Sequence, residues 1–276
     1  MLRGVAEYLS RGKELKRTLP SHAGGFRILV SPEAGGLRFW RRDLGKADPE
    51  LIRLAREFVQ PGFVVWDVGA SQGMFAFPAA RRAGPKGRVI AIEPDVRLAR
   101  LLRKSCAMSA QFPRAQVTVV PLAASDSNGP RVFRIARRAR ASNHLDGFGN
   151  SNTRGARESH LVLAVTPDWL AQCFPPPQVL KIDVEEAELC VLRKASTILR
   201  EHRPVLICEV NARNSVAGAD VLRSLRYAIY HGPGGRPAGE SLRPARGPLP
   251  SLRPSWRWTV GCPGRGGPWI IGARNA

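Results

Sequence analysis

The sequence predicts an α/β fold in which helices cover a mostly parallel sheet. Apolar runs of strand length recur at residues 64–68, 90–92, 117–121, 179–182 and 205–208. Segments with apolar residues at helical spacing separate several of these runs, and this alternation is typical of a parallel sheet. Four of the runs close on a carboxylate, namely Asp67, Glu93, Asp183 and Glu209. Because ligands bind at the carboxyl ends of such strands, these acids predict a site there.

An extension is expected ahead of the core, over residues 1–60. Residues 1–20 predict a basic amphipathic helix that docks on the domain, since they carry too little apolar surface for membrane attachment. Residues 26–30 and 37–40 predict a β-hairpin. Residues 49–60 predict a helix that leads into the first core strand. The extension is therefore expected to combine a hairpin and helices.

The first core strand runs into a glycine turn, Asp67-Val-Gly-Ala-Ser-Gln-Gly73. Gly69 would let the backbone approach a ligand, and Gly73 would let a helix start against the strand. The turn departs from the G-x-G-x-x-G pattern of dinucleotide sites, because Ser71 lies where a middle glycine might stand. An acid is unfavourable beside a pyrophosphate but suits a cationic ligand, which favours S-adenosylmethionine over NAD. A purely structural turn remains an alternative.

The second core strand ends at Glu93, which is followed by a proline. A carboxylate at this place can accept two hydrogen bonds from the cis-diol of a ribose. Together with the glycine turn, Glu93 predicts a nucleoside-containing cofactor.

Four blocks of the sequence together resemble the FkbM-type methyltransferases. They read Asp67-Val-Gly-Ala-Ser-Gln-Gly73, Glu93-Pro-Asp95, Lys181-Ile-Asp-Val-Glu-Glu-Ala-Glu188 and Arg203-Pro-Val-Leu-Ile-Cys-Glu209. The third block is the most specific, and the similarity extends from about residue 29 to about residue 230. The resemblance implies a class I, Rossmann-like fold that uses S-adenosylmethionine. It also implies methyl transfer to a hydroxyl oxygen of a sugar or natural-product acceptor.

The resemblance also implies roles for individual residues. The cofactor's methionine end would be held by the first strand end and its turn, which contribute Asp67, Gly69, Ala70, Ser71 and Gly73. Glu93 would hold the ribose, and Ser125 or Asp126 would lie near the adenine, although Asp126 is equally well explained as a turn residue. Asp183 or Glu185 would orient the acceptor hydroxyl or take its proton. Helix capping ahead of residues 187–200 is the alternative for these two acids, and both roles can coexist.

Two positions depart from the family pattern. Ser71 lies where the family usually has asparagine, a mild change because both residue types tolerate a tight turn. Glu186 lies where the family has glycine. If that position has positive φ, Glu186 costs about 1 kcal/mol or more. A protein that binds the cofactor without catalysing transfer is therefore a second hypothesis.

The core is expected over residues 61–230 and a tail over residues 231–276. Proline, glycine and arginine dominate the tail, which predicts partly irregular structure. Residues 269–272 could form a last strand. The N-terminus lacks the continuous apolar core of a signal peptide, and no run is long enough for a membrane span. Five scattered cysteines without C-x-x-C spacing predict reduced thiols of a cytoplasmic protein, and metal-ligand spacing is absent.

The net charge of +21 raises a third hypothesis, a protein that binds or modifies nucleic acid. Arginine outnumbers lysine 36 to 7 and is spread along the chain, which weakens this reading. Residues 131–140 are the densest basic cluster of the core and are expected to form a solvated loop. A Gly/Asn/Ser-rich loop at residues 143–155 follows, so an anionic small-molecule or glycan acceptor would be favoured there. Nucleic acid is the less favoured partner, and the oligomeric state stays open.

Overall fold

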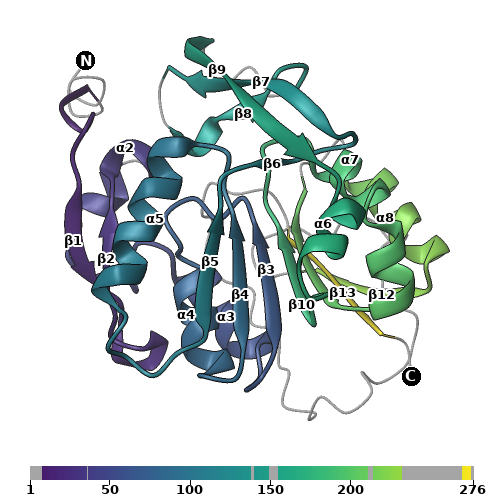
Figure 1. Cartoon of the computed structure of the whole chain (residues 1–276), viewed down its shortest axis with the longest axis horizontal. Coiled ribbons are helices and arrows are strands. Elements are labelled where there is room, and N and C mark those ends of the chain that lie inside the picture. The colour runs from purple at the N-terminus through teal and green to yellow at the C-terminus, as the bar shows by residue number, and fades with distance from the viewer. Residues whose placement is uncertain are drawn as a thin grey trace.

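A computed structural model describes residues 8–35, 37–137, 140–148, 155–210, 214–231 and 269–274. Its centre is a seven-stranded sheet with the order β12-β13-β11-β10-β3-β4-β5 (Figure 1). The strands are β3 (Val64–Val68), β4 (Arg88–Ile92), β5 (Gln116–Val120), β10 (Val179–Ile182), β11 (Val205–Glu209), β12 (Tyr227–His231) and β13 (Trp269–Arg274). The strands from β5 to β11 pair in parallel, whereas β13 lies antiparallel between β11 and β12. The α/β, mostly parallel, Rossmann-like fold is therefore confirmed, and the strand expected at residue 269 is present.

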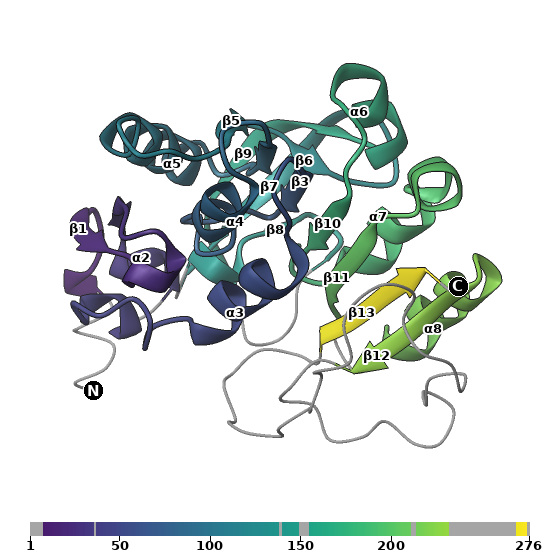
Figure 2. The same ribbon diagram turned by 90° about the horizontal axis from the view of Figure 1, so that it is seen from below.

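Helices cover both faces of this sheet (Figures 1 and 2). One side carries α3 (Pro49–Phe58), α4 (Ala76–Ala83) and α5 (Val96–Met108). The other side carries α6 (Pro167–Cys173), α7 (Glu188–Arg193), the π-helical turn η5 (Ile198–His202) and α8 (Ser215–Ser224). Because successive strand residues point to opposite faces, Val65 packs with the first group and Trp66 with the second. The sheet is thus apolar on both sides, as a parallel sheet requires.

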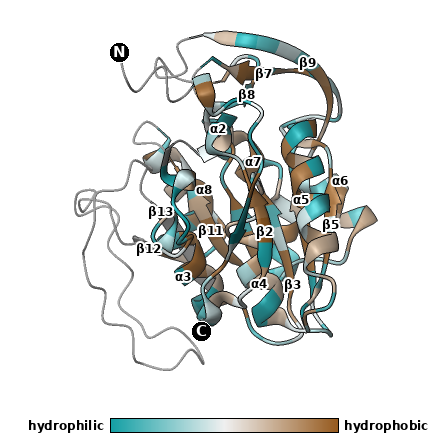
Figure 3. Cartoon of the chain, turned by 90° about the vertical axis from the view of Figure 1, so that its left-hand side faces the viewer, coloured by the Kyte–Doolittle hydropathy of each residue, from teal (hydrophilic) through white to brown (hydrophobic). Residues whose placement is uncertain are grey.

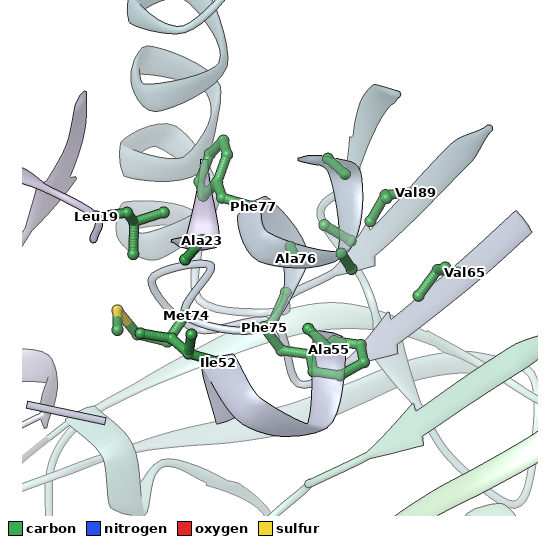
Figure 4. Packing of buried hydrophobic residues seen from close by; sticks show 14 of the residues in the cluster. Leu19, Ala23, Ile52, Ala55, Val65, Met74, Phe75, Ala76, Phe77 and Val89 are labelled. Atoms are coloured by element: carbon green, nitrogen blue, oxygen red, sulfur yellow. The ribbon is translucent and has the colours of Figure 1, made fainter. Parts of the chain in front are cut away.

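The first of these two cores also includes the N-terminal segment. Figure 4 shows Phe75 near Ala55 of α3. It also shows Phe77 near Ala23, which belongs to the short 3-10 helix η1 (Ser21–Ala23). The extension is therefore packed against α4 as part of the same hydrophobic core. Its strand β2 (Arg27–Val30), labelled in Figure 3, contributes the buried Ile28 and Val30 to that core.

The extension itself differs from the predicted hairpin. Strand β2 (Arg27–Val30) pairs antiparallel with β1 (Leu15–Thr18), not with residues 37–40. Residues after β2 turn into the helix α2 (Pro32–Gly35), since Pro32 is suited to a first helical turn, and η2 (Leu37–Trp40) is a 3-10 helix. The prediction of a helix over residues 1–20 is wrong for residues 15–18, which form the strand β1. Residues 1–7 lie outside the described part of the chain. The prediction of a helix from Pro49 is confirmed.

A second, four-stranded sheet follows the carboxyl end of β5, with the order β6-β9-β7-β8 (Figure 1). Its strands are β6 (Ala123–Ala124), β7 (Gly129–Ala136), β8 (His144–Leu145) and β9 (Ala156–Val165). The prediction of a solvated loop at residues 131–140 is therefore wrong over β7. Phe133 and Ile135 lie on either side of Arg134 and are buried in a small separate core, which is the strand pattern that the arginine count obscured.

The helix predicted over residues 186–200 is divided into α7 and η5. The Asp168 carboxylate accepts hydrogen bonds from the backbone N–H groups of Thr197 (3.1 Å) and Ile198 (3.1 Å). These bonds satisfy donors at the start of a new helical turn, so η5 begins there as a separate unit.

None of the helices in the described ranges is long and apolar enough to cross a membrane. The described cysteines, Cys106, Cys173, Cys190 and Cys208, are free thiols, and Cys262 lies outside the described residues. The prediction of reduced thiols agrees with the four that the structure describes.

Candidate cofactor and acceptor site

The glycine turn follows β3 directly and is fixed by the neighbouring strand. The N–H groups of Gly69 and Ala70 both donate to the carbonyl of Ile92, at 3.0 Å each. Gly69 has φ 79°, and a Cβ there would lie 1.9 Å from the carbonyl oxygen of Asp183. The absence of a side chain at Gly69 thus allows the backbone that follows β10 to pass close by. This reason for a glycine could not be predicted from the sequence. Ser71 also has positive φ (48°), in agreement with the asparagine that the family prefers there.

Gly73 is the last residue of the turn and lies three residues before the start of α4. Its φ is 83°, and a Cβ there would approach the ring of Phe77 to 2.6 Å. The expectation that Gly73 permits close helix packing agrees with this contact.

Glu93 lies just beyond β4 and faces the turn. Its Oε2 accepts a hydrogen bond from Ser71 N–H (2.7 Å), and its Oε1 accepts one from Asp95 N–H (2.8 Å). The residue is only 5% exposed, and burial raises its pKa to about 8. A carboxylate oxygen has two lone pairs, so each oxygen can still accept a hydrogen bond from a hydroxyl group.

Lys181 of β10 connects the two strand ends below the turn. Its Nζ lies 3.0 Å from Asp67 Oδ1 and 3.2 Å from Asp183 Oδ2, and it donates to the carbonyl of Gly69 at 2.8 Å. Burial alone would lower the pKa of this ammonium, but the two carboxylates outweigh it and raise the pKa. No role was predicted for Lys181, although a lysine inside an apolar strand is itself unusual.

Asp67 is completely buried, in contrast to a residue that lines an open site. Burial raises the pKa of its carboxyl, and the Lys181 ammonium opposes that effect. The side chain therefore acts on the site through Lys181 and the turn. Its predicted contact with the cofactor's methionine end becomes an indirect one in our account.

A group of acids follows β10, where the backbone adopts an unusual conformation. Glu185 has φ 21° and Glu186 has φ 74°, both positive for residues with a side chain. Burial, reinforced first by the charge of Asp183, raises the pKa of Glu185 to about 8. Burial also raises the pKa of Glu188 to about 7, and its Oε1 accepts a hydrogen bond from Glu186 N–H at 2.9 Å. Asp183 and Glu185 thus lie in one carboxylate cluster, two residues apart.

Ser125 and Asp126 lie at the junction of the two sheets, directly after β6. Ser125 is buried and donates its N–H to the carbonyl of Val165 at 2.9 Å. The Asp126 carboxylate pairs with Arg131 at 2.9 Å. These contacts give Asp126 a structural part in the turn, and its place near the adenine stays a prediction.

A second buried ionic cluster joins the extension, α5 and the second sheet. Arg140 pairs with Glu33 (3.1 Å) and with Asp95, and Arg157 also pairs with Glu33. Asn143 Nδ2 donates to Asp95 at 2.8 Å, while the other oxygen of Asp95 caps α5. This cluster holds the segment after Glu93 in place.

The basic segment at residues 131–140 is largely committed to pairs within the chain. Arg131 pairs with Asp126, Arg134 with Asp146 (2.6 Å), and Arg140 with Glu33. The expectation that this segment attracts an anionic acceptor loses support from these pairs.

An α/β sheet that carries a glycine turn and several carboxylates at its strand ends is typical of enzymes that use a nucleoside cofactor. The family model described as the methyltransferase FkbM domain matches residues 67–231. The hexuronic acid methyltransferase AglP of Haloferax volcanii is 31% identical over 195 residues, which are 68% of this chain and 72% of that protein. The chain belongs to the FkbM methyltransferase family, and its cofactor is S-adenosylmethionine.

The solved structures to which this chain is similar are distant from it in sequence. The methyltransferase FkbM of Methylobacillus flagellatus is 15% identical with a TM-score of 0.45, covering 83% of this chain and 52% of that chain. This chain therefore spans about half of that protein. An S-adenosylmethionine-dependent O-methyltransferase of Thermotoga maritima is 16% identical with a TM-score of 0.44, covering 83% of this chain and 65% of that one.

The residues at the strand ends fit this cofactor chemically. The turn at residues 69–73 brings backbone close to the sheet edge, where a bulkier residue at Gly69 would collide with Asp183. Glu93 offers a buried carboxylate with lone pairs left for two hydroxyl groups. The surrounding acids suit a ligand that carries an ammonium and a sulfonium charge.

Proposed function

We propose that the protein transfers the methyl group of S-adenosylmethionine to a hydroxyl oxygen of a sugar or natural-product acceptor. The single observation that carries the proposal is the position of Asp183 and Glu185. They follow the strand whose Lys181 binds both Asp183 and the carbonyl of Gly69 in the cofactor turn. The name of the Haloferax relative, a hexuronic acid methyltransferase, is consistent with a sugar acceptor.

In this proposal the cofactor is held by the predicted residues other than Asp67, which is buried and contributes only through Lys181. The backbone of Gly69, Ala70, Ser71 and Gly73 holds the methionine end, and Glu93 accepts hydrogen bonds from the ribose hydroxyls. Ser125 and Asp126 lie beside the adenine. When bound, the cofactor supplies a methyl group attached to a sulfonium sulfur. The leaving group is the neutral thioether, which needs no further activation. The protein therefore contributes alignment and exclusion of water.

The acceptor hydroxyl needs a base, because its own pKa is high. Burial raises the pKa of Glu185 to about 8. The ionised form of this carboxyl is therefore a stronger base near neutral pH than an ordinary glutamate. Asp183 is fixed from one side by Lys181, 3.2 Å away, which leaves its other oxygen to orient the hydroxyl. Glu185 accepts the hydroxyl proton in this account, and Asp183 positions the acceptor.

The test is a methyl-transfer assay with labelled S-adenosylmethionine and a panel of glycosides, applied to Asp183→Asn and Glu185→Gln. We expect kcat to fall about 100-fold or more in each variant while cofactor affinity is kept. Asp220→Asn is the matched control, because Asp220 lies exposed on α8 and pairs only locally with Arg223. If Asp183→Asn lowers cofactor affinity alone, Asp183 is a cofactor contact and the proposed role is wrong.

A protein that binds the cofactor without transfer is the second candidate, favoured by the positive φ of Glu185 and Glu186. Cofactor binding without turnover on any acceptor, with turnover gained in Glu186→Gly, would support it. The nucleic-acid hypothesis rests on the net charge of +21, and retention on heparin at raised salt is its test.

A further inference from the structure

The segment between β2 and α2 contacts the glycine turn of the cofactor site. Ser31 follows β2, and its N–H donates a hydrogen bond to Oε1 of Gln72, which lies within the turn. Both residues are buried, so water does not compete for this bond. The N-terminal extension, which precedes the family domain of residues 67–231, is thus attached directly to the turn.

The same segment also reaches the second sheet. Glu33 lies in α2, and its Oε1 accepts a hydrogen bond from Nε of Arg140 at 3.1 Å. Arg140 begins the 3-10 helix η3 (Arg140–Ser142), which lies between β7 and β8 in the chain and packs against α2. NH1 of the same arginine donates to Oδ2 of Asp95. One guanidinium therefore connects the extension with the residue that caps α5.

These contacts close a ring that contains the Glu93 carboxylate. The N–H of Asp95 donates to Oε1 of Glu93 at 2.8 Å, and the N–H of Ser71 donates to Oε2 at 2.7 Å. Ser71 precedes Gln72, from which the ring returns to the extension. Both oxygens of Glu93 are thus held, and Arg140 is the link between Asp95 and the extension.

The burial of Arg140 makes this link strong. The arginine side chain is 8% exposed and both of its carboxylate partners are buried, so solvent screens the pairs little. The guanidinium binds Glu33 and Asp95 through different nitrogens of a rigid fork, which fixes the two carboxylates relative to each other. Removing the arginine would leave buried carboxylates without this cation, which favours a rearrangement of residues 93–95.

We infer that Arg140 is a positioning residue for the cofactor. By holding Asp95, it fixes the direction in which Glu93 presents its remaining lone pairs to the 2′ and 3′ hydroxyl groups of the ribose. The inference rests on the contact between Glu93 and the ribose in the proposed function. It assigns part of the cofactor affinity to the second sheet and, through Glu33, to a segment that precedes the family domain.

The test is calorimetric binding of S-adenosylhomocysteine and of its analogue that lacks the 2′ and 3′ hydroxyl groups. The ratio of the two affinities measures the ribose contact, because the ligands share every other group. We expect a ratio of about tenfold or more in the intact protein and of about one in Glu93→Ala. In Arg140→Met the ratio should fall about fivefold while the affinity for the analogue is kept. Arg140→Lys should restore part of the ratio, because it keeps the charge but lacks the fork.

Arg134→Met is the matched control. Arg134 belongs to β7 of the same sheet and pairs with Asp146 at the surface, where the two side chains are 38% and 51% exposed. This variant should keep the ratio of the intact protein. Glu33→Gln is measured as well, and we expect it to lower the ratio about twofold to threefold, because it weakens the anchor of Arg140. Urea denaturation establishes that each variant is folded.

The outcomes separate this inference from the proposed function. An unchanged ratio in the folded Arg140 variants overturns the positioning role, since a purely structural residue affects both ligands alike. If Arg140→Met does not fold, Arg140→Lys and Glu33→Gln decide the question by the same ratio. A ratio of about one in the intact protein contradicts the ribose contact of Glu93 and overturns the inference with it. An Arg140-dependent ratio without methyl transfer to any glycoside supports the positioning role and contradicts the proposed function.

Discussion

The ammonium nitrogen of Lys181 lies 3.2 Å from Oδ2 of Asp183, and the same nitrogen lies 3.0 Å from Oδ1 of Asp67. One buried lysine therefore balances the carboxylates of two adjacent parallel strands at the edge where the cofactor turn begins. Because it also donates to the carbonyl of Gly69, the lysine links the shape of the turn to the acids of the proposed acceptor site.

Replacing Lys181 by methionine leaves Asp67 and Asp183 without their shared cation. We expect the free energy of unfolding to fall by about 3–5 kcal/mol, the usual cost of breaking a buried ion pair. Urea denaturation measures this change. Lys104→Met is the control, because Lys104 pairs with Glu14 at the surface. Adding Asp67→Asn to Lys181→Met should recover part of the loss, and a purely additive double variant would contradict the coupling.

Replacing Glu186 by glycine should stabilise the protein. Its φ of 74° strains any residue that has a Cβ, and glycine relieves that strain at some cost in unfolded-chain entropy. We expect a net gain of about 0.5–1 kcal/mol in the free energy of unfolding. Glu186→Ala removes the charge but keeps the strain, so it separates the two effects. If alanine stabilises as much as glycine, charge repulsion is the cause and not the backbone.

Much of the core could be predicted because its signals are local. Each apolar run becomes a strand, and the carboxylates at strand ends meet because parallel strands end at one edge. The pairing of β2 with β1 could not be predicted in this way, since strand partners are chosen by long-range packing. The arginines of β7 concealed a strand, because their charges are neutralised by acids such as Asp126 and Asp146 that lie elsewhere in the sequence.

The residues proposed for the site were named from the sequence, but the contacts between them could not be. Asp183 and Glu185 come together as expected, whereas the tie through Lys181 depends on the register of β10 beside β3. Sequence patterns therefore point to carboxylates at the strand ends and do not reveal the buried lysine that pairs with two of them.

Protein stability should fall as pH rises through the neutral range. Folding raises the pKa of Glu93 from 4.5 to about 8, so the folded state holds a proton that the unfolded state has lost. The contribution to stability is complete below about pH 4.5 and is lost as pH rises through about 8, at up to about 1.4 kcal/mol per pH unit. Urea denaturation between pH 5 and pH 9 measures this slope. Glu93→Gln should reduce the slope without abolishing it, because the raised pKa values of Glu185 and Glu188 contribute in the same pH range. An unchanged slope would show that Glu93 does not contribute.

Catalysis should show the ionisation of Glu185. As a base it acts only when ionised, so kcat/KM is expected to rise with pH and level off above about 8. Initial rates of methyl transfer across this range give the profile. In Glu185→Gln the residual rate should lack the rise. A profile of the same shape in that variant would assign the base to another residue.

The most direct test of the central claim, that the turn after β3 and Glu93 form the S-adenosylmethionine site, is a calorimetric titration with the cofactor. NAD is the control ligand, and Glu93→Ala is the variant. We expect micromolar binding of S-adenosylmethionine by the intact protein, no binding of NAD, and a loss of cofactor affinity of at least about tenfold in the variant. Equal affinity of the intact protein and Glu93→Ala for S-adenosylmethionine would contradict it.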